Sequence, residues 1–356
     1  MIRSLAARFR RWFLGERLWL ESRPPIPERV AADPVRLNIK ALGWKLAQEL
    51  TPGLARIDAS GEPRDHGLTS KPSTQRDVES PWFAHWCREL RLTPVYHRKL
   101  WEYAFLLQVL HERGMLGGGR SGLGFGCGAE PIASYLVGRE VAVTVTDLDP
   151  EAARGRGWME TGQHTTALDL AFRPELVSRE AFDRLASFTY VDMNHIPASL
   201  HGRFDFCWSI CAFEHLGSVE NGLRFVESAM RTLRPGGVAV HTTEFNFRCE
   251  RETVESGPTV LFLARHFAEL KERLERAGHR VGRLDFDVGD GIVDRYIDLP
   301  PYAWDAAAQE GWSTGQVHLK LSLGDFPTTC FGLVVEKAGP TGARLPGQPA
   351  PASPGA

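Results

Sequence analysis

From about residue 96 to residue 277 the sequence alternates between two hydrophobic periods, and this alternation constrains the fold more than any other feature. Apolar side chains at helical spacing, beginning with the stripe from Tyr96 to Leu110, alternate with short apolar runs that are typical of buried strands. Strands that alternate with helices form parallel sheets, because each crossover helix returns the chain to the same edge. We therefore predict an α/β fold built on a doubly wound, mostly parallel sheet.

Seven apolar runs fit the strands of such a sheet. The turn Arg-Pro-Gly-Gly at 234–237 ends the helix before the fifth of these runs, while Pro131 suits the first turn of an earlier helix and Gly138 suits its C-terminal cap. A further helical stripe, from Phe267 to Ala277, stops at Gly278. The predicted strands are 121–125, 141–146, 188–191, 204–210, 238–243, 280–286 and 329–336.

Composition divides the chain into three parts. Residues 1–80 are rich in proline and charge, and we predict a partly helical N-terminal extension with a loop at Thr69–Gln75. Residues 81–338 carry the periodic segments and are predicted to form one domain. Residues 339–356 are dominated by proline, glycine and alanine, so a disordered tail is predicted there.

Charge and cysteine usage narrow the function classes. A formal net charge of -2 argues against a protein that coats nucleic acid. The six cysteines are scattered and form no CxxC pair, which favours reduced thiols, a cytoplasmic location and no metal site. In an acidic loop, Asp287, Asp290 and Asp294 are better explained as solvated side chains than as ligands of a divalent ion.

Residues 1–20 alternate arginines with large apolar side chains and lack the small-residue cleavage site of a secretory signal. Two interpretations remain open. The favoured one is a helix that packs on its own domain, and the other is weak peripheral contact with an anionic membrane surface. No apolar run reaches the ~18 residues that a membrane-spanning helix needs.

A glycine-rich turn, GLGFGCGAEP, follows the first predicted strand. Gly126 and Gly128 lie where a strand leads into a helix, so backbone N–H groups can approach a ligand at the helix N-terminus. A GxGxxG pattern that starts at Gly117 precedes the strand, and the pattern that starts at Gly126 has Pro131 in its third glycine position. A dinucleotide-binding loop therefore fits poorly.

Acidic residues end the next two strands. Asp147 follows the glycine turn by about 20 residues, a spacing at which a carboxylate can bind the hydroxyls of a ribose. Asp192 and Met193 end the third strand, a polar and an apolar group suited to the edge and face of an adenine. Either aspartate alone is explained as a helix cap. Their occurrence in order favours an adenosine ligand.

The order GFGCG, VTDLDP, YVDM, FDFCWSICAFEH and LRPGGVAVHTTEF resembles the class I S-adenosylmethionine-dependent methyltransferases, over about residues 90–338. The resemblance implies a Rossmann-like sheet of about seven strands with an antiparallel last strand, and S-adenosyl-L-methionine as the cofactor. It also implies a set of cofactor contacts: Gly126 and Gly128 with the methionine part, Asp147 with the ribose, Leu148, Asp192 and Met193 with the adenine, and Ser209 nearby.

Two positions depart from the family pattern. Gly124 stands where such enzymes carry an acidic residue near the ammonium group of the cofactor, and Glu130 stands where they carry a third glycine. One interpretation is that Glu130 has replaced the missing carboxylate. The other is that Glu130 is an ordinary first-turn helix residue favoured by the helix dipole.

Transfer of a methyl group from sulfur requires alignment of acceptor, methyl and sulfur, and a hydroxyl acceptor also has to lose its proton. His215 is the first candidate for this base because of its ordinary pKa, followed by Glu244 and Glu214. The predicted function is methyl transfer to an oxygen of a small-molecule or glycan acceptor. The alternatives are an N-methyltransferase and a catalytically silent cofactor-binding platform, whereas the turn at Pro131 disfavours a nicotinamide oxidoreductase.

Overall fold

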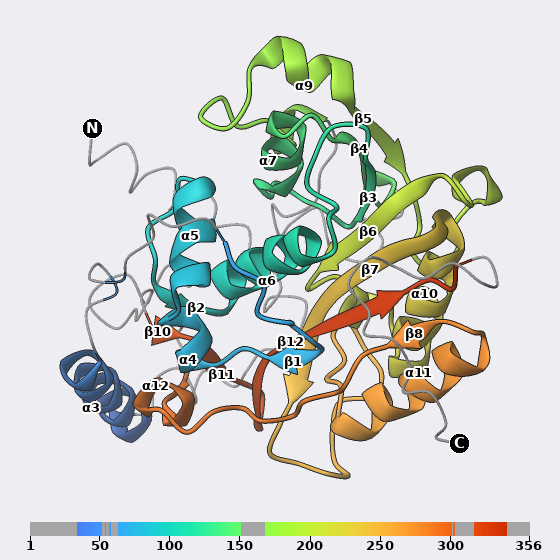
Figure 1. Ribbon diagram of the computed structural model, residues 1–356. Helices are drawn as coiled ribbons and strands as arrows, with labels where there is room; N and C mark the ends of the chain where they lie inside the picture. The colour runs from blue at the N-terminus through green and yellow to red at the C-terminus, as the bar shows by residue number, and fades with distance from the viewer. Residues whose placement is uncertain are drawn as a thin grey trace, which may run out of the picture.

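The computed structural model describes residues 34–51, 54, 57, 63–150, 168–300, 302 and 317–339. In these residues a ten-stranded sheet runs through the centre, with helices on both of its faces (Figure 1). The predicted helix in residues 1–20, residues 151–167 and nearly all of the C-terminal tail lie outside the described residues. None of the described helices combines the length and apolar character needed to cross a bilayer.

The parallel half of the sheet follows the predicted strands closely. Its order is β5-β4-β3-β6-β7, and all four pairings are parallel. Two strands have the predicted bounds, and the others differ by a few residues. They are β3 (Ser121–Phe125), β4 (Ala142–Asp147), β5 (Ala186–Tyr190), β6 (Phe204–Ile210) and β7 (Leu233–Asn246).

This strand order fixes where a ligand can bind. From β3 the chain adds β4 and β5 on one side, and it then returns to add β6 and β7 on the other side. Between β3 and β6 the connections diverge, so a crevice opens beyond the carboxyl ends of these two strands. The glycine turn follows β3, and Cys211 and Ala212 follow β6, so both segments lie at this crevice.

The second half of the sheet is built around an antiparallel strand, β12 (Phe326–Glu336), which pairs with β7 from Thr328–Asn246 to Glu336–Val238. The predicted mixed sheet with an antiparallel last strand is thus confirmed. The other edge of β12 pairs with β8 (Arg280–Val281), β1 (Lys71–Pro72) and β11 (Lys320–Leu323). Strand β11 pairs in turn with β9 (Ile297–Asp298). A separate two-stranded sheet joins β2 (Tyr96–His97) to β10 (Val317–His318).

Three local predictions need correction. Thr69–Gln75 is not entirely a loop, because β1 lies within it and Gln75 begins α4 (Gln75–Val78). The strand predicted at 280–286 is only two residues long. The Arg-Pro-Gly-Gly turn at 234–237 lies inside β7, where Gly236 has φ +80° and the pairing with β6 is irregular.

The helices cover the two faces as the alternation of side chains along the strands requires. On one face α6 (Arg98–Glu112) packs with α5 (Pro81–Glu89) and α7 (Ile132–Gly138) over residues such as Trp208. On the other face α10 (Val219–Ala229) and α11 (Ala264–Arg276) pack over residues such as Cys207. Gly138 ends α7 but is not its left-handed cap; a Cβ there would lie 2.8 Å from the carbonyl oxygen of Leu176, so packing requires the glycine.

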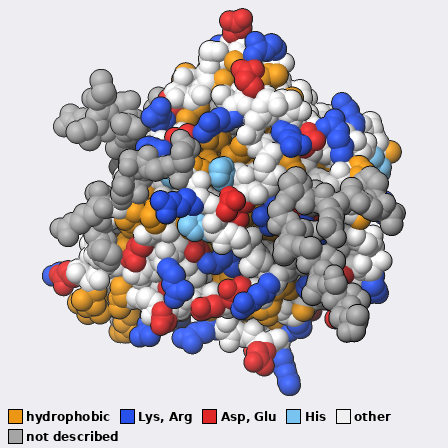
Figure 2. All heavy atoms as spheres, viewed as in Figure 1, with side chains coloured by type: hydrophobic (Ala, Val, Ile, Leu, Met, Phe, Trp, Pro, Cys, Tyr) orange, Lys and Arg blue, Asp and Glu red, His pale blue; other side chains and the backbone are white. Residues whose placement is uncertain are grey.

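Helix α3 (Pro34–Leu50) supplies the helical part of the N-terminal extension. Its buried Lys40 forms an ion pair with buried Asp298 of β9, with Nζ 3.1 Å from Oδ1, which fastens the helix to the edge of the sheet. The opposite side of α3 is apolar and exposed, and Figure 2 shows orange side chains where α3 lies in Figure 1. This apolar stripe consists of Val35, Ile39, Leu42, Leu46 and Leu50.

Candidate functional site

The glycine turn after β3 brings the backbone close to the segment that follows β6. Gly126 and Gly128 have φ +57° and +50°, values that favour glycine. A Cβ at Gly126 would lie 3.0 Å from the Cβ of Ala212 and 3.5 Å from the sulfur of Met193. A side chain there would therefore fill the crevice between β3 and β6, so the absence of one leaves a cradle of backbone.

Asp147 ties this turn to the end of β4. Its side chain is nearly buried, its Oδ2 accepts a hydrogen bond from the N–H of Gly128 at 3.3 Å, and its Oδ1 accepts one from Leu148 at 2.8 Å. These contacts orient the Asp147 carboxylate toward the glycine turn. The structure thus brings Asp147, Leu148 and the glycine turn together at one edge of the sheet.

The residues after β5 complete this edge. Asp192 accepts a hydrogen bond from the N–H of Asn194 at 2.9 Å, which holds a turn and does not cap a helix. Met193 is buried beside Gly126. Both residues therefore lie next to the crevice, and their contact with an adenine stays a prediction.

Glu130 has the feature expected of a group that binds a cation. Its Oε2 is buried and has no hydrogen-bond partner. Burial raises the pKa of this carboxyl well above its ordinary value, and Glu102 and Asp147 add to the increase although Lys99 opposes it. The orphaned oxygen and the glycine cradle fit a positively charged, nucleoside-containing cofactor, which favours the interpretation that Glu130 replaces the acidic residue missing at Gly124.

The side chain of Ser209 does not line the crevice between β3 and β6. Its side chain is fully buried, and its Oγ lies 2.8 Å from Nδ1 of His241 on the neighbouring strand. His241 in turn packs against Phe213 and Phe225, on the face that α10 covers. The expected cofactor contact of Ser209 is therefore withdrawn, because the side chain points into the core.

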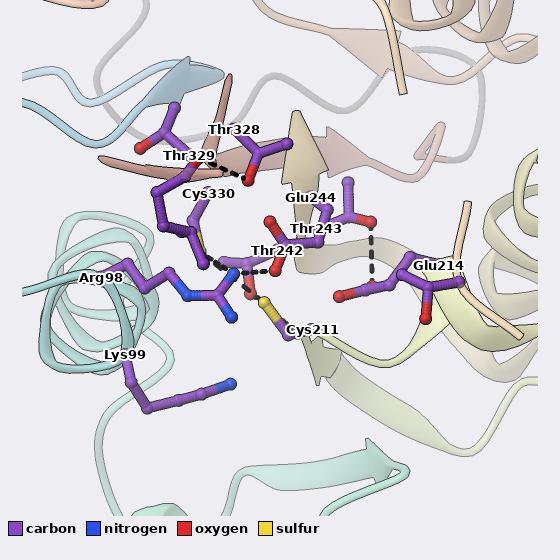
Figure 3. A network of polar contacts seen from close by, with 12 residues as sticks. Arg98, Lys99, Cys211, Glu214, Thr242, Thr243, Glu244, Thr328, Thr329 and Cys330 are labelled. Atoms are coloured by element: carbon purple, nitrogen blue, oxygen red, sulfur yellow. Dashed lines mark hydrogen bonds and ion pairs between the residues drawn. The ribbon is translucent and has the colours of Figure 1, made fainter. Parts of the chain in front are cut away.

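A buried group of polar side chains lies between α6 and the ends of β6, β7 and β12, and we call it the polar cluster (Figure 3). Acidic and basic groups alternate within it: Arg98 contacts Glu244, Lys99 lies 3.5 Å from Glu102, and Thr243 donates a hydrogen bond to Glu214 at 2.9 Å. Its members are Arg98, Lys99, Glu102, Cys211, Glu214, Thr242, Thr243, Glu244, Thr328, Thr329 and Cys330.

The pKa values of Glu214 and His215 reverse their predicted order as candidates for the base. Burial raises the pKa of Glu214 to about 7, although the hydrogen bond from Thr243 opposes the increase. Burial lowers the pKa of His215 to about 3, which corrects the expectation of a near-neutral histidine. Nδ1 of His215 lies 3.0 Å from the carbonyl oxygen of Pro258, which can only accept, so the ring hydrogen is on Nδ1. Nε2 then lies 3.8 Å from Oε1 of Glu214.

Glu244 is held in a different way. It is buried on β7, one of its oxygens contacts Arg98, and the other has no hydrogen-bond partner. The aspartates of the acidic loop lie elsewhere: Asp287, Asp290 and Asp294 line one pocket, but among the described residues they form no group whose ligand atoms all lie within 4.8 Å of one another. Asp294 instead accepts a hydrogen bond from the N–H of Gln75 at 2.8 Å and lies 3.4 Å from Lys320.

Sequence reasoning overlooked the polar residues of α6. Arg98 and Glu102 are one helical turn apart and lie on a helix whose side chains are almost all buried. The available signal was the presence of two charged residues on one side of an apolar helix, since buried charges are rare unless they are paired.

The fold and the site together define a nucleoside-binding α/β protein. The doubly wound sheet, the glycine cradle after the first parallel strand and the carboxylate at the end of the next strand form one crevice at the topological switch point. Comparisons with known proteins narrow this class. Residues 123–241 match a protein family described as "Methyltransferase domain", and these residues are a class I S-adenosylmethionine-dependent methyltransferase domain.

A curated protein that resembles part of the chain is malonyl-acyl-carrier-protein O-methyltransferase of Salmonella typhimurium, 33% identical over 117 residues. The match covers 32% of this chain and 44% of the relative, so the chain spans less than half the length of that protein. Similar solved structures include an S-adenosylmethionine-dependent methyltransferase from Aquifex aeolicus, 18% identical, with a TM-score of 0.34 and coverage of 65% of this chain and 88% of that one. The cyclase SpnF is 16% identical, with a TM-score of 0.43 and coverage of 77% and 98%.

Proposed function

We propose that this protein transfers a methyl group from S-adenosyl-L-methionine to an oxygen of a small-molecule or saccharide acceptor, with Glu214 as the proton acceptor. The observation that carries the proposal is the position of Glu214. It lies in the short helix Phe213–His215 that comes after β6, its carboxyl group is buried, and its Oε1 has no hydrogen-bond partner. When bound, the cofactor supplies a methyl group on a positively charged sulfur.

Different residues around the crevice bind the cofactor and the acceptor. Asp147 and the glycine turn hold the nucleoside side, and Glu130 pairs with the ammonium group of the cofactor. The acceptor lies on the β6 and β7 side, where an oxygen forms the new bond to carbon as the bond from carbon to sulfur breaks. The electron pair of the broken bond remains on sulfur, and the hydroxyl proton passes to Glu214.

Glu214 suits this step better than its neighbours do. A carboxyl with a pKa of about 7 is partly ionised at neutral pH and is a stronger base than an ordinary carboxylate. His215 is neutral but a weak base, because burial lowers its pKa to about 3. Glu244 already contacts Arg98. Thr243 holds one oxygen of Glu214 and leaves the other for the acceptor.

The relative supports oxygen as the methylated atom. Its name describes an O-methyltransferase that acts on a malonyl group carried by acyl carrier protein. The shared region spans 44% of that protein, so it supports the type of reaction and leaves the choice of acceptor to this chain. We keep small molecules and saccharides as the acceptor class.

The first prediction tests the proton acceptor. Glu214→Gln preserves the shape of the side chain but removes its capacity to take a proton. In single-turnover assays with methyl-labelled cofactor and a hydroxyl acceptor found by panel screening, we expect methyl transfer to fall by ~10²–10⁴-fold. The affinity for S-adenosylhomocysteine, measured by calorimetry, should change less than about twofold, because Glu214 contacts no part of that ligand in the proposal.

The matched control is Glu272→Gln, which makes the same change on an exposed side of α11 and should leave transfer unchanged. Full transfer by a folded Glu214→Gln protein would remove Glu214 from this role. Labelling of amine acceptors alone would establish the N-methyltransferase alternative. S-adenosylhomocysteine binding without labelling of any acceptor would favour the silent platform.

A further inference from the structure

Two thiols that are far apart in the sequence meet inside the polar cluster. Cys211 follows β6 and Cys330 lies on β12, 119 residues later, yet their sulfur atoms are 3.6 Å apart. Both cysteines are free thiols. Figure 3 shows the two side chains pointing into the same space beside α6. The sequence contains no CxxC pair, so only the fold brings these sulfurs together.

A buried carboxylate completes the group. An oxygen of Glu102 lies within 4.8 Å of both sulfur atoms. The side chain is fully buried, and its Oε2 accepts a hydrogen bond from Thr242. Its Oε1 has no hydrogen-bond partner. The same oxygen lies 3.5 Å from Nζ of Lys99 without a hydrogen bond, so it keeps acceptor capacity for a metal ion.

We propose that Cys211, Cys330 and Glu102 bind one divalent metal ion of the zinc class. At a bond length of about 2.3 Å, two sulfur ligands of a tetrahedral zinc ion lie about 3.8 Å apart. The observed separation of the sulfurs, 3.6 Å, is already close to that value. Thiolates select zinc over the hard ions magnesium and calcium, and a carboxylate is an ordinary third ligand.

The charges of the polar cluster allow such an ion. Glu244 contacts Arg98, and Glu102 lies 3.5 Å from Lys99, so each cation already has an acidic partner. Each thiol releases its proton when it binds the ion, and two thiolates then match the charge of the divalent ion. The occupied cluster gains no net charge.

The backbone conformation of Cys211 orients this proposed ligand before any metal binds. Cys211 has φ +45°, in the left-handed region that side chains other than glycine rarely adopt. Its N–H donates to the carbonyl oxygen of Thr242 at 3.0 Å and lies 3.1 Å from the hydroxyl of that residue. Such a strained conformation persists only where its surroundings fix it, and it places the sulfur next to Cys330. Three protein ligands leave one tetrahedral position for water or an acceptor atom.

The test uses the full chain, reduced and stripped of metal, with cobalt as a spectroscopic probe and zinc as its competitor. We expect one equivalent of cobalt to produce thiolate-to-metal charge-transfer bands and the visible bands of tetrahedral cobalt, and one equivalent of zinc to abolish them. Cys211→Ser and Cys330→Ser should each lower zinc affinity by at least about 100-fold, because even the loss of an outer contact costs 10–100-fold.

Cys249→Ser is the matched control, because Cys249 is partly exposed and lies outside the polar cluster. It should keep both the bands and the affinity. Glu102→Gln should weaken binding and keep the thiolate bands, which separates loss of a ligand from loss of the fold. Absence of thiolate bands in the reduced wild-type protein would overturn the proposal, and so would bands that persist when both Cys211 and Cys330 are replaced.

Discussion

At the scale of single residues, Gly126 and Gly202 show why backbone conformation alone does not mark a site. Both have left-handed backbones, with φ +57° and +66°. A Cβ at Gly202 would meet nothing within 4 Å, whereas one at Gly126 would approach Ala212 and Met193. Gly202 therefore serves only a turn, and Gly126 serves a turn and a crevice.

Gly126→Ala should accordingly lose both stability and cofactor affinity, whereas Gly202→Ala should lose stability alone. Each substitution places a side chain in the left-handed region, at a cost of about 1 kcal/mol or more in the free energy of unfolding. Only Gly126→Ala also fills the cradle, so it alone should lower the affinity for S-adenosylhomocysteine, by about tenfold or more. Chemical denaturation and calorimetry on both variants measure the two effects separately. Equal affinities would show that the cofactor does not use this cradle.

His241 predicts a pH dependence of stability. Burial lowers the pKa of this histidine to about 3 in the folded protein, against about 6.5 in an unfolded chain. Below pH 6.5 the unfolded state takes up a proton that the folded state does not, so the contribution of this histidine to stability is full above pH 6.5. It falls by up to about 1.4 kcal/mol per pH unit as the pH drops toward 3.

Urea denaturation of wild type and His241→Gln between pH 7 and pH 4 checks this. The variant lacks the titrating group, so its stability should fall less steeply with decreasing pH, whatever its starting value. His195→Gln is the control, because that side chain is 84% exposed. Parallel curves for wild type and His241→Gln would contradict a buried, uncharged histidine.

Residue types near the site could be predicted from the sequence, but their roles could not. The segment that holds Glu214 and His215 was identified, and the ordinary pKa values of the two side chains then favoured the histidine. Burial reverses that order, since it raises the pKa of a carboxyl and lowers that of an imidazole. The family resemblance places Ser209 near the cofactor, and only the structure shows which face its side chain occupies.

At the scale of elements, length decided what could be predicted. The five parallel strands and the helices α6 and α11 repeat their apolar side chains often enough to show a period. β1 and β9 have two residues each, too few for any period to be visible. They form because β12 and β11 offer free edges to pair with, which is a property of distant parts of the chain.

A buried ion pair contributes to the attachment of helix α3. Lys40→Ala would leave Asp298 buried without its cation, and removal of one partner of a buried pair costs about 3–5 kcal/mol. Lys45→Ala on the same helix removes only an exposed pair with Glu49, with a cost of at most about 1 kcal/mol. Denaturation curves of the two variants check the difference. Equal, small losses would show that packing alone holds α3.

At the scale of the whole molecule, β12 joins the two halves of the sheet. It forms nine residue pairs with β7 on one side and pairs with β1, β8 and β11 on the other. Phe331, Leu333 and Val335 of the same strand are buried in the core under α11. The doubly wound parallel half could be predicted from the order of motifs. The antiparallel direction of the late strand was implied only by the family resemblance, and its central place in a ten-stranded sheet was not predicted.

Truncation distinguishes β12 from the segment after it. A chain that ends at residue 338 keeps β12, so it should unfold cooperatively and bind S-adenosylhomocysteine as the full chain does. A chain that ends at residue 325 lacks β12 and should show no cooperative transition, because β7 and β11 lose their shared partner. Calorimetric melting of both chains gives the answer, and a cooperative melt of the shorter one would refute the central role of β12.

This arrangement also has a consequence during protein synthesis. Every strand that pairs with β12 precedes it in the chain, so the ribosome releases β7, β8 and β11 before their common neighbour. Until residue 336 leaves the exit tunnel, β7 and β11 present unpaired backbone groups, which other chains can bind. A nascent chain of this protein therefore exposes two unpaired strand edges until β12 has emerged, and chaperones that cover strand edges would act at that moment.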